Sequence, residues 1–473
     1  MQRARVAAAA ATTTKGSQRH VCILGGGIQG ASAAYHLTKR GCRVTMVELE
    51  KVASAASGKA GGFLARDWGS GATAKLHTES FRMHKELAEA LNLETFREID
   101  TLSVTSGKGS AGLKMTSWLD GSIRQARLLD KAGATAQVTP LELTTKLAEA
   151  ASQNGAEIVI GRATGIVSDS GASESDDRLA SAVEIELQTG EREVVACTDV
   201  LVAMGVWSTL TAPWFGLPET AWPITGIKST HVVWAGREAI VQEPAALFCG
   251  QETNGTHLEL YPRSNGDMYA CGIGGSDYVD DPQRLAVGGG ERLELDASNQ
   301  STNFTDSSPS PLPSSLLCRL DCDKPSSVSA DLSRVKAANE SAGKLSTILR
   351  SAPDHVGACM RPCPPDAMVS PPLAPLLLFP PTPLTLPLPS LLSLQPFMGR
   401  VTGFANAYIS AGHNCWGILW GPVSGLLMAE LICDGKATTA DVRTFSPSRF
   451  LPRDYERGNR GRKMGSQPIG EQW

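Results

Sequence analysis

The sequence has almost no net charge, and its cysteines show no metal-binding spacing. Its 473 residues include 44 basic and 48 acidic side chains, which gives a formal net charge of −4 at neutral pH. So weak a charge gives no reason to expect a nucleic acid or an anionic membrane as a partner. Cys318/Cys322 and Cys359/Cys363 are each separated by three residues, whereas zinc knuckles typically have two, so no metal site is expected.

The N-terminal region lacks both an apolar core segment and acidic residues. Met1–His20 therefore lacks the central feature of a secretory signal, and we expect an intracellular, reducing environment, most simply the cytoplasm. Residues 1–15 carry basic side chains among alanine and threonine, which resembles a short transit peptide to a plastid or mitochondrion. A disordered extension over residues 1–19 is the plainer interpretation.

Two stretches lack the patterns of folded protein. Ser298–Ser327 is rich in Ser, Pro, Asp and Asn and predicts a disordered loop. Val369–Gln395 has no charged residue, yet its recurring prolines would remove helical hydrogen bonds that lipid cannot replace. We therefore expect a low-complexity insertion there and no integral membrane segment.

The first folded unit is β-α-β. Val21–Leu24 predicts a strand, Ile28–Arg40 a helix after a glycine-rich turn, and Arg43–Val47 the next strand. Further elements of this alternating pattern are Leu141–Gln153, Glu157–Ile160 and Val200–Met204.

The middle of the chain has a different pattern. Gly226–Trp234, His257–Tyr261 and Met268–Cys271 predict successive strands, with a hairpin turn over Ser264–Asp267. The two patterns together indicate an α/β protein. In it, a Rossmann-type nucleotide-binding domain is interleaved with an α+β domain built on an antiparallel sheet.

Gly25, Gly27 and Gly30 form a G-x-G-x-x-G pattern between the first strand and the first helix. Gly25 allows the tight turn, Gly27 the close approach of a pyrophosphate, and Gly30 the packing of helix on strand. The free amides at the helix start then face the phosphates. Glu48, at the end of the next strand, is placed to accept hydrogen bonds from the adenosine ribose. These features predict a dinucleotide site, for FAD or NAD.

Three later segments distinguish between these cofactors. The loop Ala53–Gly62 consists mostly of small residues, which lets the chain run close over a flat ring system. Val202–Ser208 contains A-M-G-x-W-S, and Gly412–Gly425 reads G-H-x-x-W-G-I-x-x-G-P-x-x-G. In this order the motifs resemble the D-amino-acid oxidase/glycine oxidase/sarcosine oxidase superfamily of FAD enzymes.

The resemblance implies FAD as the cofactor, with the small-residue loop bordering the flavin and Gly412–Gly425 at its pyrimidine edge. A helix beginning near Pro422 would direct its amides to that edge. The cofactor-binding residues so predicted are Gly25, Gly27, Ile28, Gln29, Gly30, Glu48, Ser57, Gly58, Gly61, Gly62, Ala203, Gly205, Gly412, His413, Trp416, Gly417, Ile418 and Leu419.

The pattern and the resemblance together divide the chain into interleaved domains. The FAD-binding domain is expected over residues 20–80, 139–222, 355–368 and 396–448. The substrate domain is expected over residues 81–138 and 223–354, the insertion over 369–395 and a tail over 449–473.

The substrate side has a weaker signal. Arg361, followed by Pro362 and then Pro365-Asp366, resembles the family's R-P-x-x-P-D turn. In amino-acid-oxidising members that arginine binds the substrate carboxylate, a role that suits a planar guanidinium. An arginine paired with a structural acid is the alternative. The insertion interrupts this turn, since skipping it joins Asp366 to Pro396 in the family's spacing.

Other candidates lie near this turn. His257, Glu259, Tyr261 and Arg263 alternate along one predicted strand and share a face, which either lines the substrate pocket or meets solvent. Their candidate catalytic members are His257 and Tyr261, and His413 is either catalytic or structural. Cys359 lies where sarcosine oxidase-like members carry a cysteine bonded to FAD, although an unreactive buried thiol is the commoner outcome.

The resemblance implies an FAD-dependent oxidoreductase that oxidises a C–N bond of a small amine or amino acid by hydride transfer to flavin N5. A flavin-binding protein without turnover, with an interaction or trafficking role, is the alternative, supported by the insertion beside Arg361. An NAD-dependent dehydrogenase is disfavoured by the Ser57–Gly62 and Gly412–Gly425 motifs.

Overall fold

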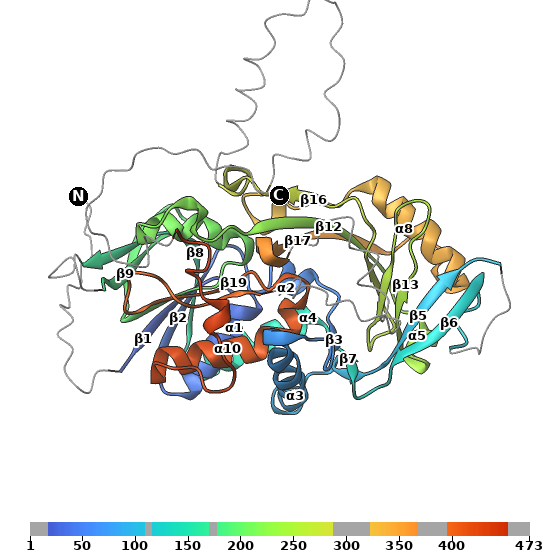
Figure 1. Cartoon of the computed structure of the whole chain (residues 1–473), viewed down its shortest axis with the longest axis horizontal. Coiled ribbons are helices and arrows are strands. Elements are labelled where there is room, and N and C mark those ends of the chain that lie inside the picture. The colour runs from blue at the N-terminus through green and yellow to red at the C-terminus, as the bar shows by residue number, and fades with distance from the viewer. Residues whose placement is uncertain (1–17, 109–115, 170–176, 287–321, 368–394, 453–473) are drawn as a thin grey trace, which may run out of the picture.

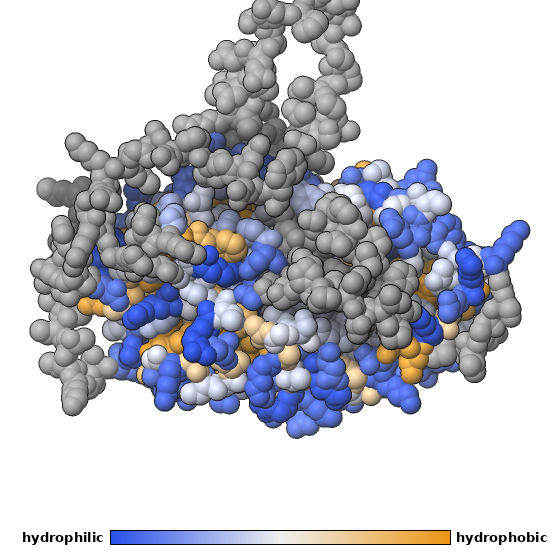
Figure 2. All heavy atoms as spheres, in the orientation of Figure 1, coloured by the Kyte–Doolittle hydropathy of each residue, from blue (hydrophilic) through white to orange (hydrophobic). Residues whose placement is uncertain are grey.

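The computed structural model of the chain describes residues 18–108, 116–169, 177–286, 322–367 and 395–452. Figure 1 shows two parts side by side, one built on β1, β2, β8 and β19 and the other on β5, β6, β12 and β13. Figure 2 shows hydrophilic residues over much of the described surface on this face, with apolar residues in small groups between them.

The first part contains an eight-stranded sheet in the order β10-β9-β8-β2-β1-β11-β19-β18. Its strands are β1 (His20–Leu24), β2 (Arg43–Glu48), β8 (Glu157–Asp169), β9 (Leu179–Leu187), β10 (Arg192–Ala196), β11 (Asp199–Val202), β18 (Phe397–Arg400) and β19 (Ala407–Ala411). The pairs from β8 to β19 are parallel, and those at both margins are antiparallel. This is the predicted Rossmann-type arrangement, with β1 at its centre.

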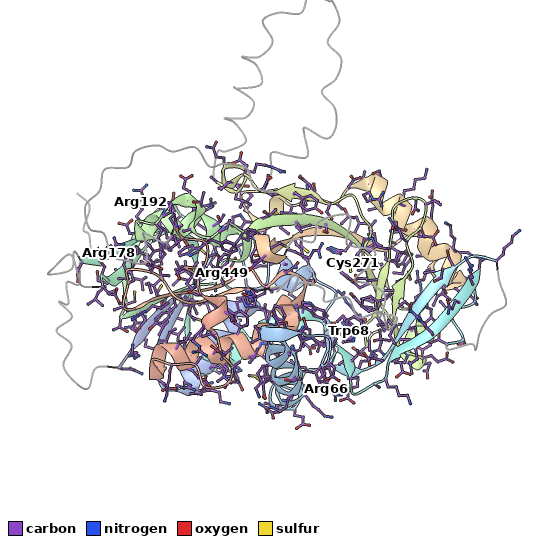
Figure 3. All side chains as sticks on the ribbon, viewed as in Figure 1. Arg66, Trp68, Arg178, Arg192, Cys271 and Arg449 are labelled. Atoms are coloured by element: carbon purple, nitrogen blue, oxygen red, sulfur yellow. The ribbon has the colours of Figure 1, made fainter. Side chains whose placement is uncertain are left out.

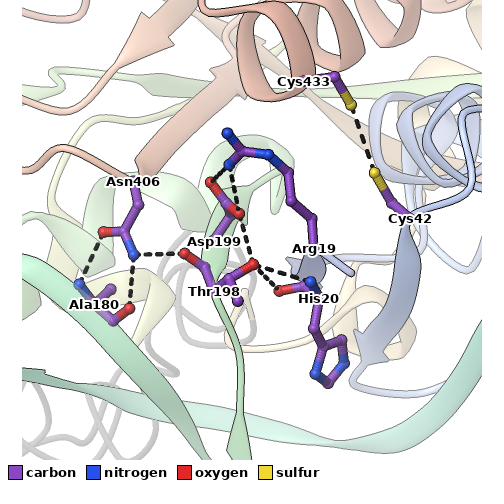
Figure 4. Close-up of polar contacts among 8 residues, drawn as sticks. All are labelled: Arg19, His20, Cys42, Ala180, Thr198, Asp199, Asn406 and Cys433. Atoms are coloured by element: carbon purple, nitrogen blue, oxygen red, sulfur yellow. Dashed lines mark hydrogen bonds and ion pairs between the residues drawn. The ribbon is translucent and has the colours of Figure 1, made fainter. Parts of the chain in front are cut away.

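An exposed arginine and a buried aspartate tie the starts of β1 and β11 together. The guanidinium of Arg19 donates to both oxygens of Asp199 at 3.0 and 3.1 Å, and Thr198 Oγ1 donates to the same carboxylate at 2.7 Å (Figure 4). Burial is the largest influence on Asp199 and raises its pKa despite these partners. At the far end of the sheet from the glycine turn, this ion pair therefore anchors β1.

Helices cover this sheet. They are α1 (Ile28–Lys39), α3 (Ala74–Ala90), α4 (Pro140–Gln153) and α10 (Gly417–Asp434), and α1 packs against both α4 and α10. Two glycines bring α10 unusually close to α1. A Cβ at Gly421 would lie 2.3 Å from Ile28 Cγ1, and one at Gly425 would lie 2.2 Å from Ser32 Oγ. Close packing of this kind leaves no room for a side chain at either position.

By length and composition alone, Asn414–Asp434 is apolar enough to cross a membrane. Its most apolar window is 72% buried inside the protein, against α1 and α3. This is the behaviour of a core helix, and nothing in it indicates contact with lipid.

The second part contains a mixed sheet in the order β16-β12-β15-β14-β13-β5-β6, with β17 also paired to β12. The strands are β5 (Asp100–Ser106), β6 (Ile123–Asp130), β12 (Thr225–Trp234), β13 (Ala245–Cys249), β14 (Glu259–Pro262), β15 (Met268–Cys271), β16 (Asp277–Val279) and β17 (His355–Cys363). All pairs are antiparallel except β13 with β5. Helix α8 (Leu332–Leu345) packs buried alanines and leucines into the core of this sheet.

Smaller elements join the two parts. A three-stranded sheet consists of β3 (Phe63–Ala65), β7 (Thr135–Gln137) and β4 (Arg97–Glu98). The short helices include α2 (Ala56–Lys59), α5 (Glu238–Gln242) and the 3-10 segment η2 (Gly205–Phe215).

The structure corrects two predicted domain boundaries. Residues 355–363 were assigned to the FAD-binding domain, but β17 pairs along its whole length with β12 and belongs to the second sheet. The boundary at residue 81 divides α3, whose Phe81, Met83 and Leu87 pack in one core with α1 and α10. In both places long-range pairing or packing decides the domain, and local sequence does not record it.

Three other predictions also need correction. The last part of the predicted disordered loop, residues 322–327, is placed, because Trp207 Nε1 donates to Cys322 O at 3.0 Å and Lys59 Nζ to Pro325 O at 3.0 Å. Residues 298–321 of that loop, like 1–17 and 368–394, lie outside the described residues. Helix α10 begins at Gly417, five residues before Pro422. The predicted tail begins too early, since Leu451 is buried in the core.

Candidate active site

A cavity of about 740 Å³ lies where the two parts meet. It runs from the carboxyl ends of β1 and β2, past the loop 54–62, to the inner face of the second sheet. In parallel α/β sheets ligands bind at this end of the strands, beside the point where the strand order reverses. Here β1 lies between β2 and β11, and the cavity opens above that point.

The glycine turn forms one end of the cavity. Gly25 has φ +107°, and a Cβ there would lie 2.5 Å from the carbonyl oxygen of Ala203. Gly27 lines the cavity, and a Cβ there would lie 3.0 Å from Ser57 Oγ. Ser57 Oγ in turn accepts a hydrogen bond from Ile28 N at 2.9 Å, at the start of α1. The turn is therefore shaped to bring a ligand directly against backbone amides.

Glu48 is fixed at the end of β2. Its Oε2 accepts from Gly26 N at 2.7 Å, and its Oε1 accepts from Glu50 N at 3.1 Å and Ser54 Oγ at 3.3 Å. Burial raises the pKa of Glu48 against the effect of these donors. The carboxylate lines the cavity and retains lone pairs for the ribose hydroxyls predicted from the sequence.

The small-residue loop lies against the second sheet. A Cβ at Gly61 would lie 2.3 Å from a ring carbon of Tyr261, and Gly62 has φ +81°. Phe63 stacks on Tyr261 with ring centroids 5.2 Å apart. No side chain fits at Gly61, so the loop and the sheet form one continuous wall.

The start of α10 forms the opposite wall, and α3 supports it. Pro422 has no N–H, so the carbonyl of Ile418 lacks its usual helical donor. His84 Nε2 lies 3.1 Å from that oxygen and 3.0 Å from Leu419 O, while Val423 N donates to Ser80 Oγ at 3.2 Å. Burial lowers the pKa of His84 to about 4, so the ring is neutral and donates through Nε2.

His413 lines the cavity but is 2% exposed, and its Nε2 lies 3.1 Å from Ser424 Oγ. Burial lowers its pKa to about 3. A ring with so low a pKa stays neutral and suits a positioning role beside the cofactor. A catalytic role for His413 in proton transfer stays a prediction.

Arg361 lines the far end of the cavity from β17, opposite Ile227 of β12. Burial opposes its charge, but the nearby acidic groups Cys363, Cys415 and Glu259 outweigh that effect and raise its pKa. Among the residues that the structure describes, none accepts a hydrogen bond from Arg361 or lies within ion-pair distance of it. The alternative of an arginine paired with a structural acid therefore finds no partner there.

Three of the four residues on the predicted strand face border the cavity. Glu259 and Tyr261 do so from β14, whereas His257 precedes β14 and is exposed. Arg263 does not border it and lies over the ring of Tyr269 at 5.3 Å. Figure 3 shows Cys271 and Trp68, two further residues of this wall, in the region between the two parts. Cys359 also lines the cavity, and burial raises the pKa of its thiol.

Most predicted cofactor residues border the cavity. Those that do are Gly25, Gly27, Ile28, Gln29, Glu48, Ser57, Gly61, Gly62, Ala203, Gly205, Gly412, His413, Trp416, Gly417 and Ile418. Gly30, Gly58 and Leu419 do not. A Cβ at Gly30 would lie 2.0 Å from Gly25 O and one at Gly58 2.1 Å from Ala53 O, so both serve close packing, and Leu419 belongs to the core.

The structure adds residues that the sequence did not single out. Arg162 and Thr164 reach the cavity because β8 continues nine residues past its predicted end at Ile160. Trp207 was part of a motif but was not assigned to the site, and Cys415 lies inside another motif. The aromatic residues Phe63, Trp68 and Phe248 line the substrate end, and only their common wall in three dimensions identifies them.

These residues fit the predicted FAD. The cavity volume lies within the range of about 300–1,000 Å³ usual for ligand and cofactor sites. The glycine turn leaves the space a Cβ would fill, and the carboxylate of Glu48 is held at the ribose end. Gln29 donates to Gly417 O at 3.0 Å, which ties the start of α1 to the start of α10 beside the cavity.

Comparison with known proteins agrees with this geometry. The family model described as FAD dependent oxidoreductase (DAO) matches residues 20–431. The Schizosaccharomyces pombe protein named “Putative oxidoreductase C1F5.03c” is 24% identical over 464 residues, which cover 92% of this chain and 99% of that protein.

Solved structures show the same fold. Glycine oxidase from Geobacillus kaustophilus superposes with a TM-score of 0.60 at 19% identity, covering 92% of this chain and all of that one. L-Amino acid deaminase from Proteus myxofaciens has a TM-score of 0.64 at 17% identity, covering 92% of this chain and 94% of that one.

Proposed function

The chain belongs to the DAO family of FAD-dependent oxidoreductases, and we propose that it uses this cofactor to oxidise a C–N bond of an amine or amino acid. Two proteins that share the fold, glycine oxidase and L-amino acid deaminase, are named for reactions on amino acids. Within this class the chain's own residues favour a substrate with a carboxylate.

One observation carries the proposal: Arg361, which has no partner among the described residues, presents its guanidinium to the cavity at the end away from the glycine turn. A half-buried cation without a partner is costly, and a bidentate carboxylate is the ligand that best matches its planar donors. A substrate carboxylate would therefore both relieve that cost and fix the orientation of the substrate.

The other walls of the cavity would orient the substrate and exclude water. Bound FAD would supply the two-electron acceptor, with a hydride passing from the substrate α-carbon to flavin N5. Phe63, Trp68 and Phe248 form an apolar aromatic wall beside Tyr261, with ring centroids of Trp68 and Phe248 5.1 Å apart. The neutral, buried His413 offers no charge that would attract solvent.

The test is reduction of the bound flavin without oxygen. Purified protein is expected to be yellow, and its visible absorbance should bleach when mixed anaerobically with one or more compounds of a panel of amines and of D- and L-amino acids. The matching 2-hydroxy acids serve as controls and should not bleach it. A yellow protein that no compound of the panel reduces would contradict the proposal and favour a flavin-binding protein without turnover.

A further inference from the structure

Glu259 places a carboxylate inside the same cavity as Arg361. One of its oxygens, Oε2, is held in place: Tyr261 Oη donates to it, and Cys271 Sγ donates to it at 3.6 Å. The other oxygen, Oε1, has no hydrogen-bond partner in the described part of the chain. Some polar side-chain atoms without a partner are fully buried in this protein, but Oε1 of Glu259 is not one of them. Glu259 is therefore oriented by one oxygen and free to bind by the other.

The two groups that orient Glu259 are reliable donors. Burial raises the pKa of Tyr261 and that of Cys271 well above their usual values, so both stay protonated. Register explains why they meet, since Glu259 pairs with Cys271 across β14 and β15, and Tyr261 lies two residues further along β14. Strand geometry puts all three side chains on the face that lines the cavity.

The charged and titratable groups near Glu259 come from several elements. They are Cys249 of β13, Tyr261, Cys271, Arg361 of β17 and Cys415 before α10, each of which is influenced by the charge of Glu259. Only Arg361 among them is cationic. It forms no ion pair with Glu259, so among the described residues this end of the cavity holds an unpaired cation and an unpaired anion.

We propose that Glu259 binds a cationic nitrogen of the substrate through its free oxygen while Arg361 binds the substrate carboxylate. The site then selects zwitterions over simple acids and simple amines. This inference rests on the proposed function for the identity of the ligand, but it concerns binding and can be measured without turnover.

The probe is α-aminoisobutyrate, a zwitterion with no hydrogen on its α-carbon, which therefore cannot lose a hydride there. Isobutyrate has the same skeleton without the nitrogen. Binding of both to the FAD-loaded protein is measured by calorimetry, for the wild type and for Glu259→Gln. The amide keeps an acceptor for Tyr261 and Cys271 but removes the charge. Glu193→Gln, the same change at an exposed position on β10, is the matched control.

Where Glu259 binds the α-ammonium group, Glu259→Gln is expected to weaken the binding of α-aminoisobutyrate by roughly 10- to 100-fold, the usual effect of losing one charge-assisted hydrogen bond. Isobutyrate should bind equally well or more tightly, because the variant lacks a charge that repels it. Glu193→Gln should change neither. This opposite response of two ligands distinguishes charge recognition from a general disturbance of the site.

A third ligand, α-methylornithine, identifies which nitrogen Glu259 binds. Weaker binding of both α-aminoisobutyrate and α-methylornithine to the variant assigns Glu259 to the α-ammonium group, and weaker binding of α-methylornithine alone assigns it to a side-chain ammonium. Either result supports the proposal. Equal loss for isobutyrate, no loss for any ligand, or no binding of either zwitterion to the wild type would overturn it. Flavin bleaching by the amine panel is scored separately, so failure of the proposed reaction is distinguishable from failure of this contact.

Discussion

Arg449 forms an ion pair with Asp366, Nε to Oδ2 at 3.1 Å, and the same guanidinium binds the carbonyl oxygens of Gln395 and Pro396 at 2.7 and 3.2 Å. Figure 3 labels Arg449 within the first part of the molecule. The guanidinium carbon of Arg449 also lies over the ring of Phe397, 3.9 Å from its centroid. One side chain therefore holds Asp366 close to Gln395 and Pro396, the described residues on either side of 368–394.

Removal of that stretch should leave the fold intact. The contact to Gln395 moves the predicted boundary, so the deletion should cover residues 369–394 and keep Gln395. An uncharged Leu- and Pro-rich segment promotes association when exposed, so soluble yield and flavin content per protein should stay level or rise. Both are measured from the yield and from the ratio of visible to ultraviolet absorbance. An insoluble or colourless product would show that the segment is an integral element.

Gly27→Val should yield a colourless protein. Its Cβ would lie 3.0 Å from Ser57 Oγ, and its methyl groups would occupy the space that a pyrophosphate needs. Gly343→Val, in α8 and outside the cavity, is the control and should remain yellow. Retention of stoichiometric FAD by the Gly27 variant would show that the glycine turn does not have the predicted role in binding the pyrophosphate.

Arg361→Ala should impair turnover of carboxylated substrates. Losing a charge-assisted bond to a buried group costs about 2–4 kcal/mol, or on the order of 30- to 1,000-fold in kcat/KM. Arg361→Lys keeps the charge but loses the planar arrangement of donors, so its kcat/KM should lie between those of the wild type and of Arg361→Ala. An amine without a carboxylate should respond little. Equal losses on both substrate types would instead indicate that Arg361 supports the fold.

Acid should destabilise the protein through its buried histidines. Burial lowers the pKa of His84 to about 4 from an ordinary value of 6.5. Between these values the unfolded chain binds a proton that the folded chain does not, so stability is full above pH 6.5 and falls as the pH drops toward 4. His84 alone contributes roughly 3 kcal/mol to that loss.

His84→Gln provides the measurement. Glutamine keeps an N–H donor for Ile418 O but does not titrate, so the fall in melting temperature from neutral to acid pH should be smaller than in the wild type. The melting temperature of the variant will still fall toward acid pH, because burial also lowers the pKa values of His36 and His231 to about 4. Parallel pH profiles for variant and wild type would exclude His84 as a contributor.

Much of the cofactor site follows from local sequence. The turn at Gly25–Gly30 and the carboxylate of Glu48 lie within one β-α-β unit, whose hydrogen bonds are set by neighbouring residues. Their positions at one end of the cavity were therefore predictable from spacing alone. The opposite wall was predicted only through its motif, and its helix was expected to begin near Pro422, whereas α10 begins at Gly417. His84 and Ser80, which satisfy the backbone around that proline, come from a helix more than 300 residues earlier, as the separations show.

The substrate end was harder to predict for the same physical reason. Alternation along one strand correctly grouped Glu259 and Tyr261, but could not show which face meets the cavity. That depends on Gly61 packing against the Tyr261 ring, a contact between residues 200 positions apart that requires the absence of a Cβ. The assignment of β17 failed likewise, because its partner β12 lies at the other end of residues 223–354, the second segment of the predicted substrate domain.

The central sheet also sets an order of events during synthesis. β1 pairs with β11, and β11 pairs with β19, so β11 lies between strands from near both ends of the chain. A ribosome releases the N-terminal β-α-β unit first. At that time neither β19 nor α10, with the wall from Gly412 to Ile418, has been translated. The nascent chain therefore has a phosphate turn but no closed cavity, and FAD capture must wait until nearly all of the protein has emerged.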